Sequence, residues 1–122
     1  MKAEELAGKQ CVPCRAGGVP LHREQAERYL EAVPAWSLSE DATRLTRRFE
    51  FQDFVEAMEF VNRVARIAEA QGHHPDIAIH WNKVELVLWT HAIGGLHEND
   101  FVVAAKIDRL LDAPDVSSQP AG

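Results

Sequence analysis

The fold is decided by one continuous stretch, residues 53–91, which reads DFVEAMEFVNRVARIAEAQGHHPDIAIHWNKVELVLWTH. Its first part spaces apolar side chains as a helix does, and Asp53 and Gly72 are suited to begin and end that helix. The side chains that we expect on its buried face are Phe54, Val55, Met58, Val61, Val64, Ala65 and Ala68. The stretch therefore predicts one long helix between Asp53 and Gly72.

Two strands are expected directly after this helix. In residues 76–81 the isoleucines Ile77 and Ile79 fall at alternate positions, residues 82–83 suit a tight turn, and residues 84–91 alternate again. In the second strand one face would carry Val84, Leu86, Leu88 and Thr90, and the other would carry Glu85, Val87, Trp89 and His91. The helix should thus be followed by a β-hairpin.

The flanking residues predict a second unit of the same kind and a closing helix. Residues 20–33 have helical periodicity that Pro34 ends, and strands are expected over 36–38 and 44–51. Leu45, Phe49 and Phe51 would share the inner face of the second of these strands, with Arg47 as the exception. Residues 100–112 predict a last helix, buried along Phe101, Ala104, Ala105, Ile107 and Leu111.

The resulting order, α-β-β-α-β-β-α, is typical of an α+β fold. We expect a four-stranded antiparallel sheet with the helices packed on one face. Residues 20–112 would form this domain, residues 1–19 a flexible N-terminal leader and residues 113–122 a disordered C-terminal tail. Val87 and Trp89 on the uncovered face favour burial against a second copy of the chain.

The composition excludes several classes of function. The 122 residues are 46% hydrophobic and carry a net charge of −6, which fits one soluble domain and disfavours nucleic acid or an anionic membrane as partner. No apolar run has the roughly 20 residues that a membrane span needs. The N-terminal residues contain no apolar signal core, so we expect a cytoplasmic protein.

The two cysteines, Cys11 and Cys14, form a C-x-x-C pair. Such a pair is compatible with redox chemistry or zinc binding. The surrounding glycines and prolines predict a loop, however, and a zinc site would need two more ligands, of which His22 could supply only one. We favour two reduced thiols in the leader, with the redox and metal alternatives left open.

Four of the six histidines fall within residues 69–91. His73 and His74 stand where the long helix ends, and Pro75 favours an extended backbone at His74. His91 ends a strand that can run beside that junction, so three imidazoles could converge at one end of the sheet. Each could instead cap carbonyl groups or fill space, and the spacing matches no known zinc pattern. A neutral and a protonated imidazole together could take and give a proton, as the elimination of water requires.

The spacing of a set of positions resembles the signature of the pterin-4a-carbinolamine dehydratases (4a-hydroxytetrahydrobiopterin dehydratases). The positions are Glu69, His73, His74, Pro75, Trp81, His91 and Asp100, together with the Gly-Leu pair that ends WNKVELVLWTHAIGGL, residues 81–96. The resemblance covers residues 20–111. It implies the element order given above and a homodimer or homotetramer.

The resemblance also implies an activity: dehydration of 4a-hydroxytetrahydropterin, left by aromatic amino acid hydroxylases, to quinonoid dihydropterin without metal or organic cofactor. His73 and His91 would be the acid–base pair, and His74 would bind or orient the pterin. Supporting positions would be Glu69, Trp36, Pro75, Trp81 and Asp100. The Cys11–Cys14 leader would add nothing to this site.

One departure from the family pattern concerns His97, which stands where Ser or Thr is usual. The capping box between that position and Asp100 should therefore be lost. Some relatives are binding proteins instead of enzymes, either Rubisco assembly factors or a dimerisation cofactor of a homeodomain transcription factor. Because this chain keeps the whole histidine set, we favour the enzyme, while association with Rubisco or a hydroxylase stays open.

Overall fold

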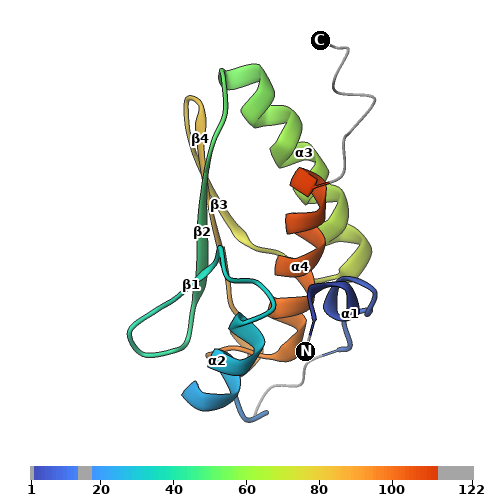
Figure 1. Ribbon diagram of the computed structural model, residues 1–122, viewed down its shortest axis with the longest axis vertical. Coiled ribbons are helices and arrows are strands. Elements are labelled where there is room, and N and C mark those ends of the chain that lie inside the picture. Colours follow the sequence, from blue (N-terminus) through green and yellow to red (C-terminus); the bar gives the residue numbers. More distant parts are fainter. Residues whose placement is uncertain (1, 14–17, 113–122) are drawn as a thin grey trace.

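The computed structural model describes residues 2–13 and 18–112 (Figure 1). Its elements are α1 (Ala3–Ala7), α2 (Arg23–Leu30), β1 (Ser37–Leu38), β2 (Leu45–Glu50), α3 (Phe54–Gln71), β3 (Asp76–His80), β4 (Lys83–Leu88), the 3-10 turn η1 (His91–Ile93) and α4 (Glu98–Asp112). The predicted α+β class and element order are confirmed, with α1 as an addition. Cys14 and the predicted tail, residues 113–122, lie outside the described residues.

The four strands form one antiparallel sheet in the order β1-β2-β4-β3. Leu45 lies opposite Leu88 and Phe49 opposite Val84, so their side chains share the face that the helices cover. Figure 1 shows α3 and α4 side by side on that face. The predicted inner residues of β4 are buried together with those of β2, and they form the centre of the core.

Local signals set the two ends of α3. The Asp53 carboxylate accepts the amide of Glu56 at 2.9 Å, and Gly72 takes the left-handed conformation with a φ of 63°. The buried face differs from the prediction, because Phe54 and Val55 are 48% and 64% exposed. The first turn of α3 extends beyond the end of α4 (Figure 1), so no described helix packs over those two side chains. The buried residues are instead Ala57, Phe60, Val61, Val64 and Ala68.

The turn of the second hairpin is Trp81–Asn82, one residue earlier than predicted. Trp81 has a φ of 55°, which is unusual for a side chain of its size. Asn82 fixes this turn to the end of β2, because its side-chain amide donates to the Phe51 carbonyl at 2.8 Å and its own carbonyl accepts the Phe51 amide at 2.8 Å. The contacts with β2 therefore decide the position of the turn.

The irregular structure predicted for the N-terminal leader is wrong for residues 3–7. They form α1, which packs against α4, and Leu6 is fully buried in the common core. The Lys106 ammonium donates to the Ala7 carbonyl at 2.8 Å. A helix of five residues is too short to show a periodicity, and at this length it depends on tertiary packing for most of its stability.

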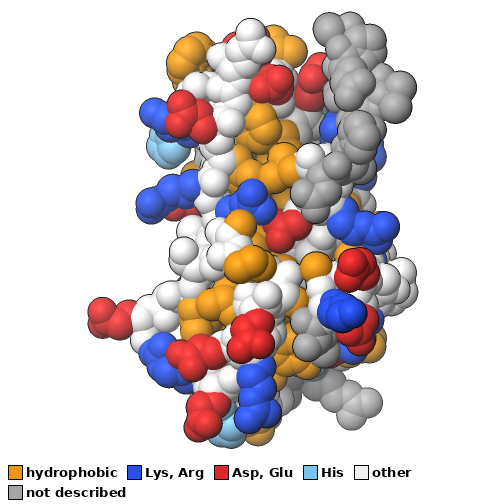
Figure 2. Space-filling model, viewed as in Figure 1, with side chains coloured by type: hydrophobic (Ala, Val, Ile, Leu, Met, Phe, Trp, Pro, Cys, Tyr) orange, Lys and Arg blue, Asp and Glu red, His pale blue; other side chains and the backbone are white. Residues whose placement is uncertain are grey.

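The face of the sheet opposite the helices carries mixed side chains. Arg48 and Glu85 form an ion pair there at 2.8 Å, and Val87, two residues along β4 from Glu85, is half-buried. Figure 2 views the sheet from its edge, and on the side of the molecule that it shows, Lys and Arg side chains are interspersed with Asp and Glu. The burial of this face against a second copy stays a prediction. No helix in the described part of the chain is both long and apolar enough to cross a membrane.

Replacement of Leu6 by alanine tests whether α1 belongs to the core. Because the side chain is fully buried, we expect Leu6→Ala to lower the free energy of unfolding by about 2–5 kcal/mol in urea denaturation. The matched control is Val55→Ala, whose exposed side chain should cost no more than about 0.5 kcal/mol. Equal stabilities of the two variants would contradict the packing of α1.

Candidate active site

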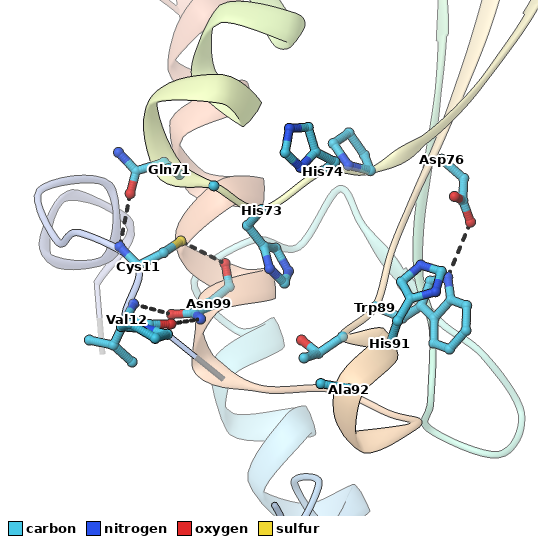
Figure 3. Close-up of a pocket in the computed structure, with 14 residues that line it drawn as sticks. Cys11, Val12, Gln71, His73, His74, Asp76, Trp89, His91, Ala92 and Asn99 are labelled. Atoms are coloured by element: carbon cyan, nitrogen blue, oxygen red, sulfur yellow. Dashed lines mark hydrogen bonds between the residues drawn. The ribbon is translucent and has the colours of Figure 1, made fainter. Parts of the chain in front are cut away.

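A pocket of about 590 Å³ opens where α3 ends and where the chain leaves β4 (Figure 3). Three separate segments and one residue of α4 line it: Cys11, Val12, Pro13, Gln71, Gly72, His73, His74, Pro75, Asp76, Trp89, Thr90, His91, Ala92 and Asn99. The structure thus brings His73, His74 and His91 to one pocket, at the end of the sheet where the sequence placed them.

The backbone after α3 sends the two adjacent histidines in different directions. Gly72 turns the chain out of the helix, and the His73 amide closes the helix end by donating to the Ala68 carbonyl at 3.2 Å. The side chain of His73 is 12% exposed and that of His74 is 58% exposed. Pro75, which follows, is buried. His73 therefore points into the protein and His74 stays near the rim.

Asp100 holds His73 in place without itself lining the pocket. Its carboxylate is fully buried and lies 2.6 Å from the His73 Nε2 atom. The second carboxylate oxygen accepts the Thr90 hydroxyl at 2.8 Å and the His97 amide at 3.0 Å. Because a carboxylate can only accept, the neutral His73 ring carries its proton on Nε2. The Nδ1 atom is then the ring nitrogen left for proton exchange with a ligand.

The capping box that we expected to be lost at α4 is kept in another chemical form. The His97 Nδ1 atom accepts the Asn99 amide at 3.0 Å, while Asp100 accepts the His97 amide. A ring nitrogen thus replaces the usual hydroxyl oxygen as the acceptor. The prediction was wrong because the periodicity of the sequence does not show which histidine nitrogen faces a helix end.

His91 reaches the pocket from η1, because β4 ends at Leu88 and not at His91 as predicted. Its ring lies against Trp89, with 3.7 Å between the ring centroids and an angle of 32°. The Trp89 indole nitrogen donates to the Asp76 carboxylate at 3.1 Å, and the Arg44 guanidinium lies 3.6 Å from the Trp89 ring. Trp89, which the sequence assigned to a subunit interface, therefore supports His91 and lines the pocket.

The other predicted site residues differ in their distance from the pocket. Glu69 binds His74, with 2.6 Å between its carboxylate and the Nε2 atom, but both side chains are exposed and Glu69 does not line the pocket. Trp36 is a core residue that donates to Asp108 at 2.8 Å. Trp81 is 65% exposed at the opposite end of the hairpin. The structure does not bring the two tryptophans to the pocket.

The sequence missed several residues of the pocket. Thr90 gave a usable signal, because it is the polar residue on the otherwise apolar face of the predicted strand, residues 84–91, and precedes His91. The sequence around Cys11 gave no signal of this kind, because Cys11 is hydrogen-bonded to Gln71, which lies sixty residues further along the chain. The expectation that the leader adds nothing here is wrong, because three of its residues line the pocket. In the described part of the chain, no three His, Cys, Asp or Glu side chains form a group that could hold a metal ion.

The sequence matches a known protein family over most of its length. The family model described as pterin 4 alpha carbinolamine dehydratase matches residues 19–110. The chain belongs to this family. A protein of Halorhodospira halophila, provisionally named pterin-4-alpha-carbinolamine dehydratase, is 52% identical over 105 residues, which are 86% of this chain and 96% of the relative. A relative of the same name from Methylococcus capsulatus is 50% identical over 110 residues, which are 90% of this chain and 96% of the relative.

The fold also matches a solved structure. The crystal structure of a transcriptional coactivator/pterin dehydratase from Brucella melitensis is similar to this chain, with a TM-score of 0.71 and 31% sequence identity. The match covers 75% of this chain and 97% of the Brucella chain. The sheet and the helices that carry the pocket are thus a shared family fold.

Replacement of Asp100 by asparagine tests its contact with His73 without reference to any activity. An amide group cannot accept from all three donors, so we expect Asp100→Asn to lower the free energy of unfolding by about 1–3 kcal/mol. The ¹⁵N shifts of His73 should report the Nε2–H form in the parent and a mixture of ring forms in the variant. The control is Glu69→Gln, which should leave His73 unchanged. Identical His73 spectra in Asp100→Asn and the parent would contradict the contact.

Proposed function

We propose that the protein dehydrates 4a-hydroxytetrahydropterin to quinonoid dihydropterin, and so recycles the pterin cofactor of aromatic amino acid hydroxylases. The observation that carries this proposal is the pairing of His73 with a buried carboxylate in the same pocket as His91, in a member of the dehydratase family. The family supplies the substrate class, and the pocket supplies two imidazoles from separate segments.

The reaction needs one proton acceptor and one proton donor. The substrate loses a proton from N5 and the hydroxyl group from C4a, a double bond forms between N5 and C4a, and water leaves. Hydroxide is a poor leaving group, so a general acid must protonate it while a base takes the N5 proton. In this proposal His73 and His91 divide the two roles, and Asp100 positions His73 by fixing the ring form that exchanges its proton through Nδ1.

The remaining pocket residues would bind the substrate. The pterin is a flat bicyclic ring, and the Trp89 and His91 rings offer it a flat surface at one side of the pocket. His74, held by Glu69 at the rim, would contact the substrate without exchanging the reacting protons. Pro75 would fix the extended backbone that separates His73 from His74.

Alanine variants of the two histidines test the acid–base proposal. We expect His73→Ala and His91→Ala each to lower kcat by about 10²–10⁴-fold, because each removes a positioned proton-transfer group. The measurement is the decay of the 4a-hydroxytetrahydropterin absorbance in a hydroxylase-coupled assay. The matched control is His80→Ala, an exposed histidine of β3 outside the pocket, which should keep the parent's rate. Unchanged rates in both pocket variants would rule out this mechanism.

A second candidate function is binding to another protein without catalysis. It is favoured by the name of the similar Brucella protein, which joins transcriptional coactivator with pterin dehydratase. A binding protein would not depend on imidazole chemistry. The purified chain would then be inactive in the coupled assay, and His73→Ala and His91→Ala would retain the partner as the parent does. Loss of turnover in both variants would instead favour the enzyme.

A further inference from the structure

One side of the pocket is formed by residues that precede the part of the chain matched by the family model. Cys11, Val12 and Pro13 line the pocket, whereas the match begins at residue 19. In Figure 3 His73 lies between this segment and the pair formed by Trp89 and His91. Residues 11–13, here called the N-terminal wall, therefore face the pocket from the side opposite His91.

The N-terminal wall is attached to the same two helix ends that carry the central site residues. The side chain of Asn99, only 3% exposed, accepts the Val12 amide at 3.0 Å and donates to the Val12 carbonyl at 2.6 Å. The Cys11 amide donates to the Gln71 side chain at 2.8 Å, two residues before His73. The wall is therefore attached close to His73 and Asp100, because Gln71 lies two residues before His73 and Asn99 directly precedes Asp100.

The residues before the wall strengthen this attachment. The Lys9 ammonium and the Tyr29 hydroxyl each lie 2.9 Å from the Glu98 carboxylate. Burial acts to raise the pKa of Glu98, but the hydrogen bonds from Lys9 and Tyr29 outweigh it and hold this pKa below its ordinary value. Glu98 thus stays charged at neutral pH and retains Lys9. With Leu6 in the core as well, the wall is a fixed part of the molecule.

The chemistry of the wall indicates what it would contact. The backbone amides of Cys11 and Val12 donate to the side chains of Gln71 and Asn99, and the Cys11 thiol donates to the Asn99 carbonyl at 3.7 Å. What the wall presents to a ligand is therefore mainly carbon, from Val12 and the Pro13 ring. Such a surface suits carbon atoms better than the hydrogen-bonding pyrimidine edge of a pterin. The C6 substituent is bonded next to N5, and it is the part that would extend beyond His73 when N5 and C4a lie between the two histidines.

We propose that the N-terminal wall is a substrate-binding surface that contacts the C6 substituent of the pterin. This inference rests on the proposed function and adds a specificity element to it. The wall takes no part in proton transfer, so it should contribute equally to the binding of substrate and of transition state. Its loss would therefore change KM and leave kcat as it is.

The test is Val12→Asp, which places a charge on the wall and keeps the backbone contacts with Asn99. Deletion of residues 2–13 is unsuitable, because it would remove Leu6 from the core. We expect KM to rise about 5–10-fold for a pterin with a carbon side chain at C6, and kcat to stay within about twofold. Val55→Asp is the control, since Val55 is similarly exposed but lies on the first turn of α3, and it should keep both constants.

A second readout separates substrate contact from a structural role. Dihydropterin should slow hydrogen exchange in residues 9–13 of the parent, and Val12→Asp should weaken this protection. If the parent is active and Val12→Asp keeps the parent's KM, or lowers kcat alone, the N-terminal wall does not bind the substrate. The proposed function would remain intact in that case. A parent that neither turns over the substrate nor gains protection from dihydropterin would overturn both.

Discussion

The buried carboxylate of Asp100 is the interaction on which the rest of the site depends. A fully buried carboxylate is costly unless donors surround it, and here three segments supply them: His73 after α3, Thr90 after β4 and His97 before α4. The same contacts satisfy the charge, join two helices to the sheet and fix the ring form of His73. The contacts of Asp100 therefore contribute both to the stability of the fold and to the position of His73.

The sheet determines which side chains line the side of the pocket that faces His73. β4 lies between β2 and β3, and the chain that follows it keeps the alternation, so that Thr90 faces inward to Asp100 and Trp89 lines the pocket. The chain then turns into η1, which carries His91 against the Trp89 ring. The N-terminal wall completes the enclosure from the side of α4. The pocket is thus assembled from segments whose positions are fixed by separate parts of the core.

Most of the fold could be predicted from the sequence because its signals are local. The alternation in β4 and the residues at the two ends of α3 act within a few positions, and they gave the elements and their order. The predictions were wrong where contacts between distant residues determine the structure. Phe60, and not Phe54, packs into the core, and contacts with the end of β2 fix the turn at Trp81–Asn82. The sequence did not predict α1, because a helix of five residues is too short to show a hydrophobic periodicity.

For the site, the sequence by itself predicted that His73, His74 and His91 could converge at one end of the sheet, because the element order places the end of the long helix beside the end of the last strand. Tertiary structure alone decided that Asp100 binds His73. It also decided that Cys11, from the far end of the chain, lines the same pocket. Those outcomes depend on which side chains face one another across packed helices, and spacing along a single chain does not contain that information.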